Sequence, residues 1–170
     1  MTPFELVEPA TLHQALELLD PEDMAVRPLG GGPALMLMMK SGLFAPRRLV
    51  GLSAIEQRYR CIETSTDGAI EIGAMMTLRQ LETSGDVRRH APVIAETLRT
   101  LANARVRNVA TVGGNLAHGD PHMELAPVLL ALGANVAIAG ATTERRIPLA
   151  DFHRGYYETA LATDELIVGL

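Results

Sequence analysis

The chain has 170 residues, a length that suits one ordinary domain or two small lobes, and 48% of them are hydrophobic, enough for a sizeable core. Its formal net charge of −5 argues against a nucleic-acid binder, because such proteins need a basic surface. Cys61 is the only cysteine, which excludes an intrachain disulfide and a cysteine-ligated iron–sulfur cluster. We therefore expect the protein to be located in the reducing cytoplasm. No run of about 20 apolar residues is present to span a membrane.

The first third of the chain is predicted to form a small βαβ layer, a first lobe at about residues 1–56. Thr11 and Gln14 form a capping-box pattern, so a helix is expected to begin there. Three further elements are predicted after it: a strand over 25–29, a helix over 34–40 and a second strand over 48–52.

The second lobe, about residues 57–170, is predicted to be a mainly antiparallel sheet covered by helices. A hairpin is expected to close around Asp67-Gly68, and the alternation at Val136 and Ile138 predicts a strand that pairs with residues 145–149. Helices are predicted after the capping-box pattern of Thr77 and Gln80, along the apolar stripe of Ile94, Leu98 and Leu101, and over 123–132. The sequence therefore predicts a fold of the α+β class.

Three short arginine clusters stand out against the acidic background: Arg88-Arg89, Arg105 with Arg107, and Arg145-Arg146. Acidic residues offset them elsewhere in the chain, and runs of charge mostly lie on solvated faces. We therefore predict that these arginines are exposed to solvent.

The first glycine segment is Gly30-Gly31-Gly32-Pro33-Ala34, where a strand ends and a helix begins. Glycines allow a sharp turn and let a ligand approach without a Cβ in the way, and the first-turn amides of the helix favour an anion. Pro33 fits the first helical position but removes one possible donor to a phosphate. A plain tight turn explains this segment equally well, and its spacing matches neither a Walker A loop nor a dinucleotide-binding fingerprint.

The second glycine segment runs from Thr111 to Pro121 and leads into an expected helix start at Asp120-Pro121. Its glycine pair, Gly113 and Gly114, is expected to offer bare amides, while the side chains of Thr111 and Asn115 can bond phosphate oxygens. Because each lobe carries one such segment, we expect the two segments to bind one diphosphate between the lobes.

Four potential metal-binding side chains lie within or just after the second segment: His118, Asp120, His122 and Glu124. A His-x3-His spacing places two imidazoles on one helix face. Pro121 interrupts that spacing and Asp120 is a natural helix cap, so we predict no metal site. No serine is set apart as a nucleophile, and no catalytic residue is expected.

The run from Arg107 to Pro121, RNVATVGGNLAHGDP, resembles the signature of the FAD-binding medium subunit of molybdenum hydroxylases. Aerobic carbon monoxide dehydrogenase and xanthine dehydrogenase are the best-known members of that family. Residues 29–35 stand where the family has its first flavin loop, and residues 155–161 are similar to a third segment of its pattern. The resemblance covers essentially the whole chain.

The resemblance implies a two-lobed FAD-binding domain of the vanillyl-alcohol oxidase/PCMH type, with FAD held non-covalently between the lobes. Pro33 departs from the family pattern, which usually has a hydroxyl or amide side chain there, and this puts one ligand hydrogen bond in question. The residues that the resemblance assigns to FAD are Leu29, Gly30, Gly31, Gly32, Pro33, Ala34, Leu35, Ala110, Thr111, Gly113, Gly114, Asn115, Ala117, His118, Glu124 and Leu161.

The function that the resemblance implies is electron transfer. A large partner subunit with molybdopterin oxidises the substrate, a small partner subunit carries iron–sulfur clusters, and this chain passes the electrons through FAD to an external acceptor. Family members continue for about another hundred residues, the size of a small domain, and this chain is expected to lack that C-terminal domain. A non-catalytic nucleotide-binding module and a self-contained flavin oxidase remain as alternatives.

Overall fold

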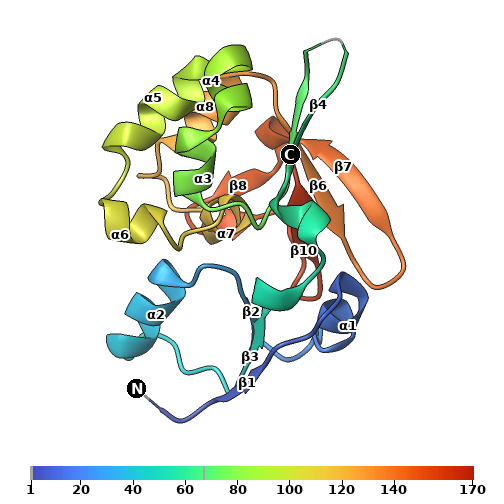
Figure 1. Ribbon diagram of the computed structural model, residues 1–170. Helices are drawn as coiled ribbons and strands as arrows, with labels where there is room; N and C mark the ends of the chain where they lie inside the picture. Colours follow the sequence, from blue (N-terminus) through green and yellow to red (C-terminus); the bar gives the residue numbers. More distant parts are fainter. Residues whose placement is uncertain (1, 67) are drawn as a thin grey trace.

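A parallel three-stranded sheet forms one end of the molecule in the computed structural model, which describes residues 2–66 and 68–170 (Figure 1). The strand order is β1-β3-β2, and both pairs are parallel. The strands are β1 Glu5–Val7, β2 Val26–Leu29 and β3 Arg48–Gly51, with the helices α1 Leu12–Glu17 and α2 Pro33–Lys40 in the connections. The βαβ layer predicted from the sequence is therefore present.

The sequence did not predict β1, one of the two edge strands of this sheet. Its three residues, Glu5 to Val7, show no alternation of polar and apolar side chains, and two of them are exposed. Its place in the sheet comes from backbone pairing with β3, in which Leu6 lies beside Leu49.

An antiparallel sheet of order β10-β6-β7 forms the second layer, as expected. Two further strand pairs flank it: the hairpin β4–β5, whose turn residue Asp67 lies outside the described residues, and β8–β9. The strands are β4 Ile62–Thr64, β5 Ile70–Ile72, β6 Asn135–Ala139, β7 Glu144–Pro148, β8 His153–Gly155, β9 Glu158–Thr159 and β10 Leu166–Gly169.

Six helices cover one side of this layer (Figure 1). They are α3 Leu78–Thr83, α4 Gly85–His90, α5 Pro92–Thr100, α6 Ala104–Arg107, α7 Val112–His118 and α8 Leu125–Ala131, with short 3₁₀ turns at Leu52–Ala54, Gln57–Arg60 and Leu149–Asp151.

Local sequence signals explain where several helices begin and end. The full capping box of Thr77 and Gln80 is present at the start of α3. At α1 only half of the expected box forms: Thr11 accepts from the Gln14 N–H, but the Gln14 side chain accepts from Ala10. Gly133, with φ +70°, follows α8 as predicted.

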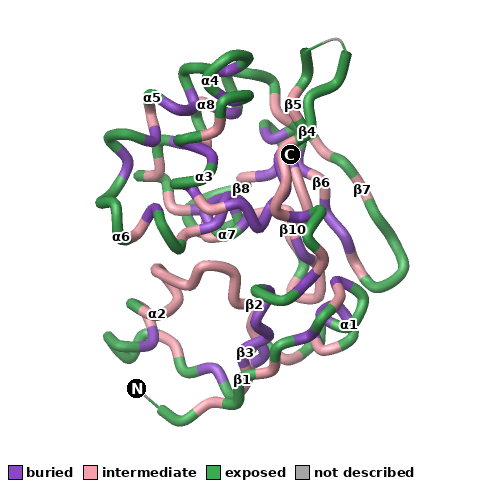
Figure 2. Tube along the Cα trace, in the orientation of Figure 1, coloured by how far each residue is buried: buried purple, intermediate pink, exposed green. Residues whose placement is uncertain are grey.

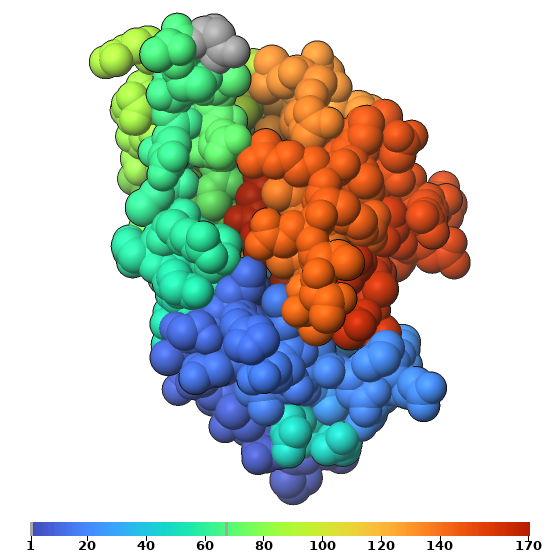
Figure 3. Space-filling view, turned by 90° about the vertical axis from the view of Figure 1, so that its right-hand side faces the viewer, coloured from blue at the N-terminus to red at the C-terminus, as the bar shows by residue number. Residues whose placement is uncertain are grey.

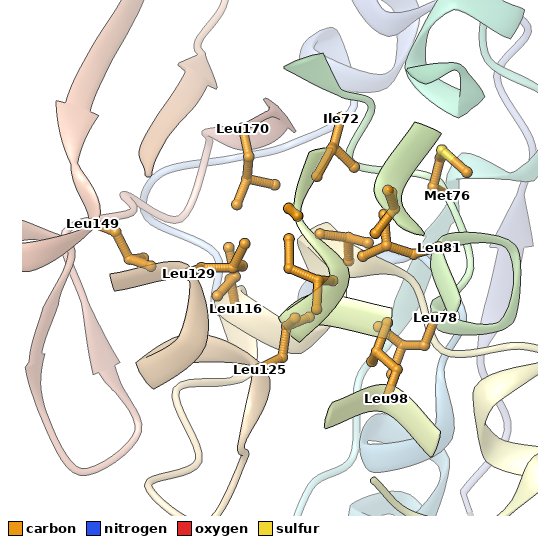
Figure 4. Close-up of a cluster of buried hydrophobic side chains, with 14 of the residues drawn as sticks. Ile72, Met76, Leu78, Leu81, Leu98, Leu116, Leu125, Leu129, Leu149 and Leu170 are labelled. Atoms are coloured by element: carbon orange, nitrogen blue, oxygen red, sulfur yellow. The ribbon is translucent and has the colours of Figure 1, made fainter. Parts of the chain in front are cut away.

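The larger of two hydrophobic clusters lies between helices α3–α8 and the antiparallel sheet (Figure 2). Figure 4 shows leucines from distant segments meeting there, among them Leu98, Leu116, Leu129 and Leu170. The smaller cluster packs α1 and the parallel sheet against Tyr59, Met75, Ala139 and Leu166, so it joins residues from both sides of residue 56. None of the helices in the described residues is long and apolar enough to cross a membrane.

Phe152 is the largest side chain that is fully buried in this structure, at 0% exposure, and its replacement tests the larger core. We predict that Phe152→Ala lowers the free energy of unfolding by about 3–5 kcal/mol, because lost apolar burial and a residual cavity add together. Tyr156→Ala is the control: Tyr156 is 80% exposed, so its loss should change stability by no more than about 0.5 kcal/mol. Urea unfolding followed by circular dichroism measures both, and equal losses would contradict the core described here.

Candidate functional site

The two glycine segments predicted from the sequence lie in direct contact, although they are far apart in the chain. A Cβ on Gly31 would lie 1.8 Å from the carbonyl oxygen of Val109, and one on Gly30 would lie 2.8 Å from Thr111 Oγ1. No side chain fits at the first position, because the neighbouring atoms are backbone. In Figure 1 the turn between β2 and α2 runs beneath α7 accordingly.

The start of α2 carries backbone N–H groups that are free within the described residues. Gly32 is the N-cap in the left-handed conformation, φ +78°, and Pro33 occupies the first helical position as predicted. The N–H groups of Gly31, Gly32, Ala34 and Leu35 have no acceptor in the described part of the chain. Unpaired amides at a helix N-terminus attract an anion, so this turn suits a phosphate group.

The second glycine segment forms helix α7 and the start of the turn after it rather than an open loop, and its glycine pair lies in the first turn of the helix. Thr111 is the N-cap, and its Oγ1 accepts from the Gly114 N–H at 3.2 Å. The Gly113 N–H donates to the Ala74 carbonyl at 2.8 Å, and a Cβ on Gly113 would lie 2.8 Å from the Cβ of Ala74. The prediction that this glycine pair offers bare amides is therefore wrong, because the cap and the chain at residue 74 already use them.

The expected helix start at Asp120-Pro121 is also wrong. Gly119, with φ +63°, ends α7 in the left-handed conformation, and α8 begins only at Leu125. A turn lies between them, in which Asp120 Oδ1 accepts from the backbone N–H of His122 at 2.9 Å. That hydrogen bond lowers the pKa of Asp120 below its usual value. Within residues 2–66 and 68–170 no three His, Cys, Asp or Glu side chains gather to hold a metal ion.

The outward face of α7 carries small side chains. Gly114 and Ala117 are exposed and His118 is half-buried, whereas Val112 and Leu116 on the other face are fully buried. Positions i, i+3 and i+4 share one helix face, so the first three residues form a surface with room above Gly114 and Ala117. The His118 ring bounds it and lies 5.2 Å from the ring of Tyr157.

Asn115 presents a polar atom that finds no partner within the protein. The residue is 8% exposed, and its Oδ1 is the one buried side-chain oxygen or nitrogen without a hydrogen bond among the described residues. A buried acceptor left unpaired costs free energy, so it is a natural place for a donor from a ligand.

The third segment of the pattern packs against the end of α7. The Tyr157 N–H donates to the Gly119 carbonyl at 3.0 Å. Leu161 is half-buried against the larger core cluster, together with Ala110. Glu124 is exposed just before α8 and makes no hydrogen bond or ion pair with any described residue.

Two surface grooves lie elsewhere, and none of the sixteen residues assigned to FAD lines either of them. The first, about 370 Å³, has Val168, Gly169 and Leu170 at its floor, between residues 58–73 and the strand β7 (Figure 3). The second, about 330 Å³, lies between α1 and the turn that joins β6 to β7.

Comparison with known proteins decides the family. The family described as the FAD binding domain in molybdopterin dehydrogenase matches residues 2–170. The chain belongs to this family. The resemblance read from residues 107–121 is thereby confirmed, and so is the mixed helix-and-sheet architecture of an FAD-binding domain.

Several relatives of this FAD-binding domain are named as medium chains or subunits of dehydrogenases. It is 33% identical over 167 residues to the carbon monoxide dehydrogenase medium chain of Afipia carboxidovorans, covering 98% of this chain and 57% of that protein. It is 30% identical to the xanthine dehydrogenase FAD-binding subunit of Escherichia coli, covering 94% and 54%. The structure of carbon monoxide dehydrogenase from Hydrogenophaga pseudoflava matches with a TM-score of 0.93 and 32% identity, covering 99% of this chain and 59% of that one. The chain thus spans somewhat over half the length of these relatives.

The contact between the two glycine segments generates a prediction about Gly31. Because its Cβ would overlap the Val109 carbonyl, Gly31→Ala should lower the free energy of unfolding by about 1–3 kcal/mol through overpacking. Gly85→Ala is the matched control, since a Cβ there meets nothing within 4 Å, and it should be neutral or slightly stabilising. Chemical denaturation of the two variants checks this, and a Gly31→Ala protein as stable as wild type would show that the segments do not touch.

Proposed function

We propose that this chain binds FAD non-covalently where its two glycine segments meet and acts as the flavin-carrying, electron-transfer part of a molybdenum-dependent hydroxylase. The observation that carries the proposal is the backbone contact of Gly31 with Val109, beside the free amides at the start of α2. The residues fit the cofactor in two further respects: the exposed face of α7 carries only small side chains at Gly114 and Ala117, and Asn115 keeps a buried acceptor unpaired.

The diphosphate is proposed to lie at the start of α2. Four N–H groups are free there to donate to phosphate oxygens, and the helix dipole favours the negative charge. Pro33 contributes no donor, so the amides on either side of it carry the contact. Thr111 Oγ1 accepts from Gly114, which leaves its own hydroxyl proton available to a phosphate oxygen.

The flavin is proposed to lie along the outward face of α7, over Gly114 and Ala117. Small residues let a flat ring approach a helix closely, and His118 and Leu161 would bound the ring on two sides. We propose the same sixteen contact residues that the sequence resemblance assigns: Leu29, Gly30, Gly31, Gly32, Pro33, Ala34, Leu35, Ala110, Thr111, Gly113, Gly114, Asn115, Ala117, His118, Glu124 and Leu161.

The division into two lobes, at about residues 1–56 and 57–170, and the assignment to the vanillyl-alcohol oxidase/PCMH type belong to the same proposal. The change from a parallel sheet to an antiparallel one between these parts supports it. The core cluster that joins both parts would hold the lobes together.

A large molybdopterin subunit and a small iron–sulfur subunit are the partners we propose. The relatives' names support this, since they denote medium chains and FAD-binding subunits of carbon monoxide and xanthine dehydrogenases. FAD supplies the redox chemistry when it is bound, and the residues of this chain hold and orient it. The chain has one cysteine, so cysteine-ligated clusters would lie on a partner. A cytoplasmic location stays a prediction from cysteine usage.

Non-covalent binding is open to a direct experiment. The purified chain is expected to bind added FAD, and acid precipitation should then release all of the yellow colour into the supernatant. Absorbance of supernatant and pellet at the flavin maximum measures this. Flavin in the pellet would contradict non-covalent attachment, and a chain that binds no FAD would contradict the proposed function. Efficient oxidation of an organic substrate by the chain alone would favour a self-contained oxidase.

Gly114→Val is expected to abolish FAD binding while the circular dichroism stays near that of the wild type. The valine side chain would stand on the exposed face of α7, in the space proposed for the cofactor, and its Cβ meets only Thr111 Oγ1, at 2.9 Å. Gly140→Val is the control, because its Cβ would make only ordinary contacts of 3.5 Å or more in the β6–β7 turn. Fluorescence titration with FAD compares them, and unchanged affinity in Gly114→Val would remove α7 from the site.

A further inference from the structure

A buried ion pair joins Glu82 to Arg107, two residues before Val109, whose carbonyl oxygen meets Gly31. The side chains are 11% and 8% exposed, and Arg107 Nε donates to Glu82 Oε2 at 3.0 Å. The prediction that the arginine clusters are exposed is therefore wrong for Arg107. The physical reason lies in the tertiary structure, because Glu82 reaches the guanidinium from another helix, α3.

The other hydrogen bonds of this pair join it to backbone carbonyl groups and to a second arginine. Arg107 Nη1 donates to the carbonyl oxygens of Leu101 and Ala102, at 2.9 and 3.0 Å. The other Glu82 oxygen accepts from Arg79 at 2.8 Å. Burial by itself raises the pKa of Glu82, but the hydrogen bonds from the two arginines outweigh it and leave the pKa below its usual value.

The turn that Arg107 holds is strained. Ala102 has φ +50°, a left-handed conformation that a residue with a Cβ rarely adopts. Such a conformation persists where surrounding contacts over-determine it, and the guanidinium bonds to the carbonyls on this turn are contacts of that kind. The turn leads directly into α6, which ends at Arg107.

Helix α3 is attached to the chain before α7 at two points. At its C-terminal end Glu82 pairs with Arg107, and at its first residue the Leu78 N–H donates to the Ala110 carbonyl at 2.9 Å. Val109 lies between these two attachments. Its carbonyl oxygen contacts the first glycine segment and leaves no space for a Cβ on Gly31. The position of that carbonyl therefore depends on both attachments.

Stability alone is a weak reason for such a pair. Replacing a buried ion pair with apolar groups of similar size is often neutral or stabilising, because the desolvation of both charges offsets their attraction. An apolar side chain at 107 would fill the same space but could not hold the two carbonyls or attach α3. The pair supplies directional contacts, which fix the position of a backbone segment.

We propose that Arg107 and Glu82 are positioning residues for the cofactor: together they hold residues 108–111 against Gly30 and Gly31, and so set the shape of the FAD site without touching FAD. This inference rests on the proposed function for its effect on FAD, but the effect on the chain itself is measurable without the cofactor.

Arg107→Met and Glu82→Gln test the proposal, with Leu98→Ala as the control. Leu98 is fully buried in the larger core, so its truncation destabilises the fold without removing a hydrogen bond or an ion pair to residues 108–111. Amide hydrogen exchange without FAD should rise locally, over residues 101–114, in Arg107→Met and more weakly in Glu82→Gln. In Leu98→Ala the increase should spread over the whole core.

FAD titration is the second readout. Arg107→Met is expected to weaken FAD binding by about tenfold or more, because displacement of residues 108–111 would misplace their contacts with FAD. Leu98→Ala should bind FAD as the wild type does at a temperature where both are folded, and Arg107→Lys should lie between, because a lysine replaces only part of the guanidinium fork.

Three results would overturn the proposal. One is wild-type exchange and affinity in Arg107→Met, and another is an increase in exchange spread over the core as in Leu98→Ala. The third is loss of folding in both Arg107→Met and Glu82→Gln, which would make the pair a stability element. A wild-type chain that binds no FAD would instead contradict the proposed function, while the exchange pattern would still decide whether the pair positions this segment.

Discussion

The approach of Gly31 to the carbonyl oxygen of Val109 is the contact on which the rest of the site depends. It brings two backbones so close that any Cβ on Gly31 would overlap the oxygen. Because backbone meets backbone, the contact fixes the start of α2 relative to the N-cap of α7 without any flexible side chain between them. The two glycine segments therefore form one surface, although residues 35–110 separate them along the chain.

The two helix starts on that surface have different chemistry. At α2 several amides are free, and a proline and glycines leave the approach open. At α7 the amides are taken by the threonine cap and by the carbonyls of Ala74 and Met76, so that helix offers small side chains instead. One side of the surface thus favours an anion and the other a flat apolar group, as a flavin dinucleotide requires.

The structure behind this surface is held by directional bonds rather than by apolar packing alone. Carbonyls of residues 74 and 76 accept from the first turn of α7, and Leu78 donates back to Ala110. The buried pair of Arg107 and Glu82 completes this support from the far end of α3. Because these bonds join backbone groups and buried charges in fixed directions, they set the position of the segments that form the surface.

Local sequence signals determined much of this protein: the capping box at Thr77 and Gln80, the strand before Gly30, the stop at Gly133 and the signature that identified the family. Each is a property of neighbouring residues, and neighbours suffice to read it. Only the tertiary structure decided that β1 joins the sheet, that the Gly113 amide bonds Ala74, and that Arg107 is buried against Glu82. In each of these the partner lies far away in the sequence, and a hydrogen bond or a buried charge exists only once the fold has brought that partner within reach.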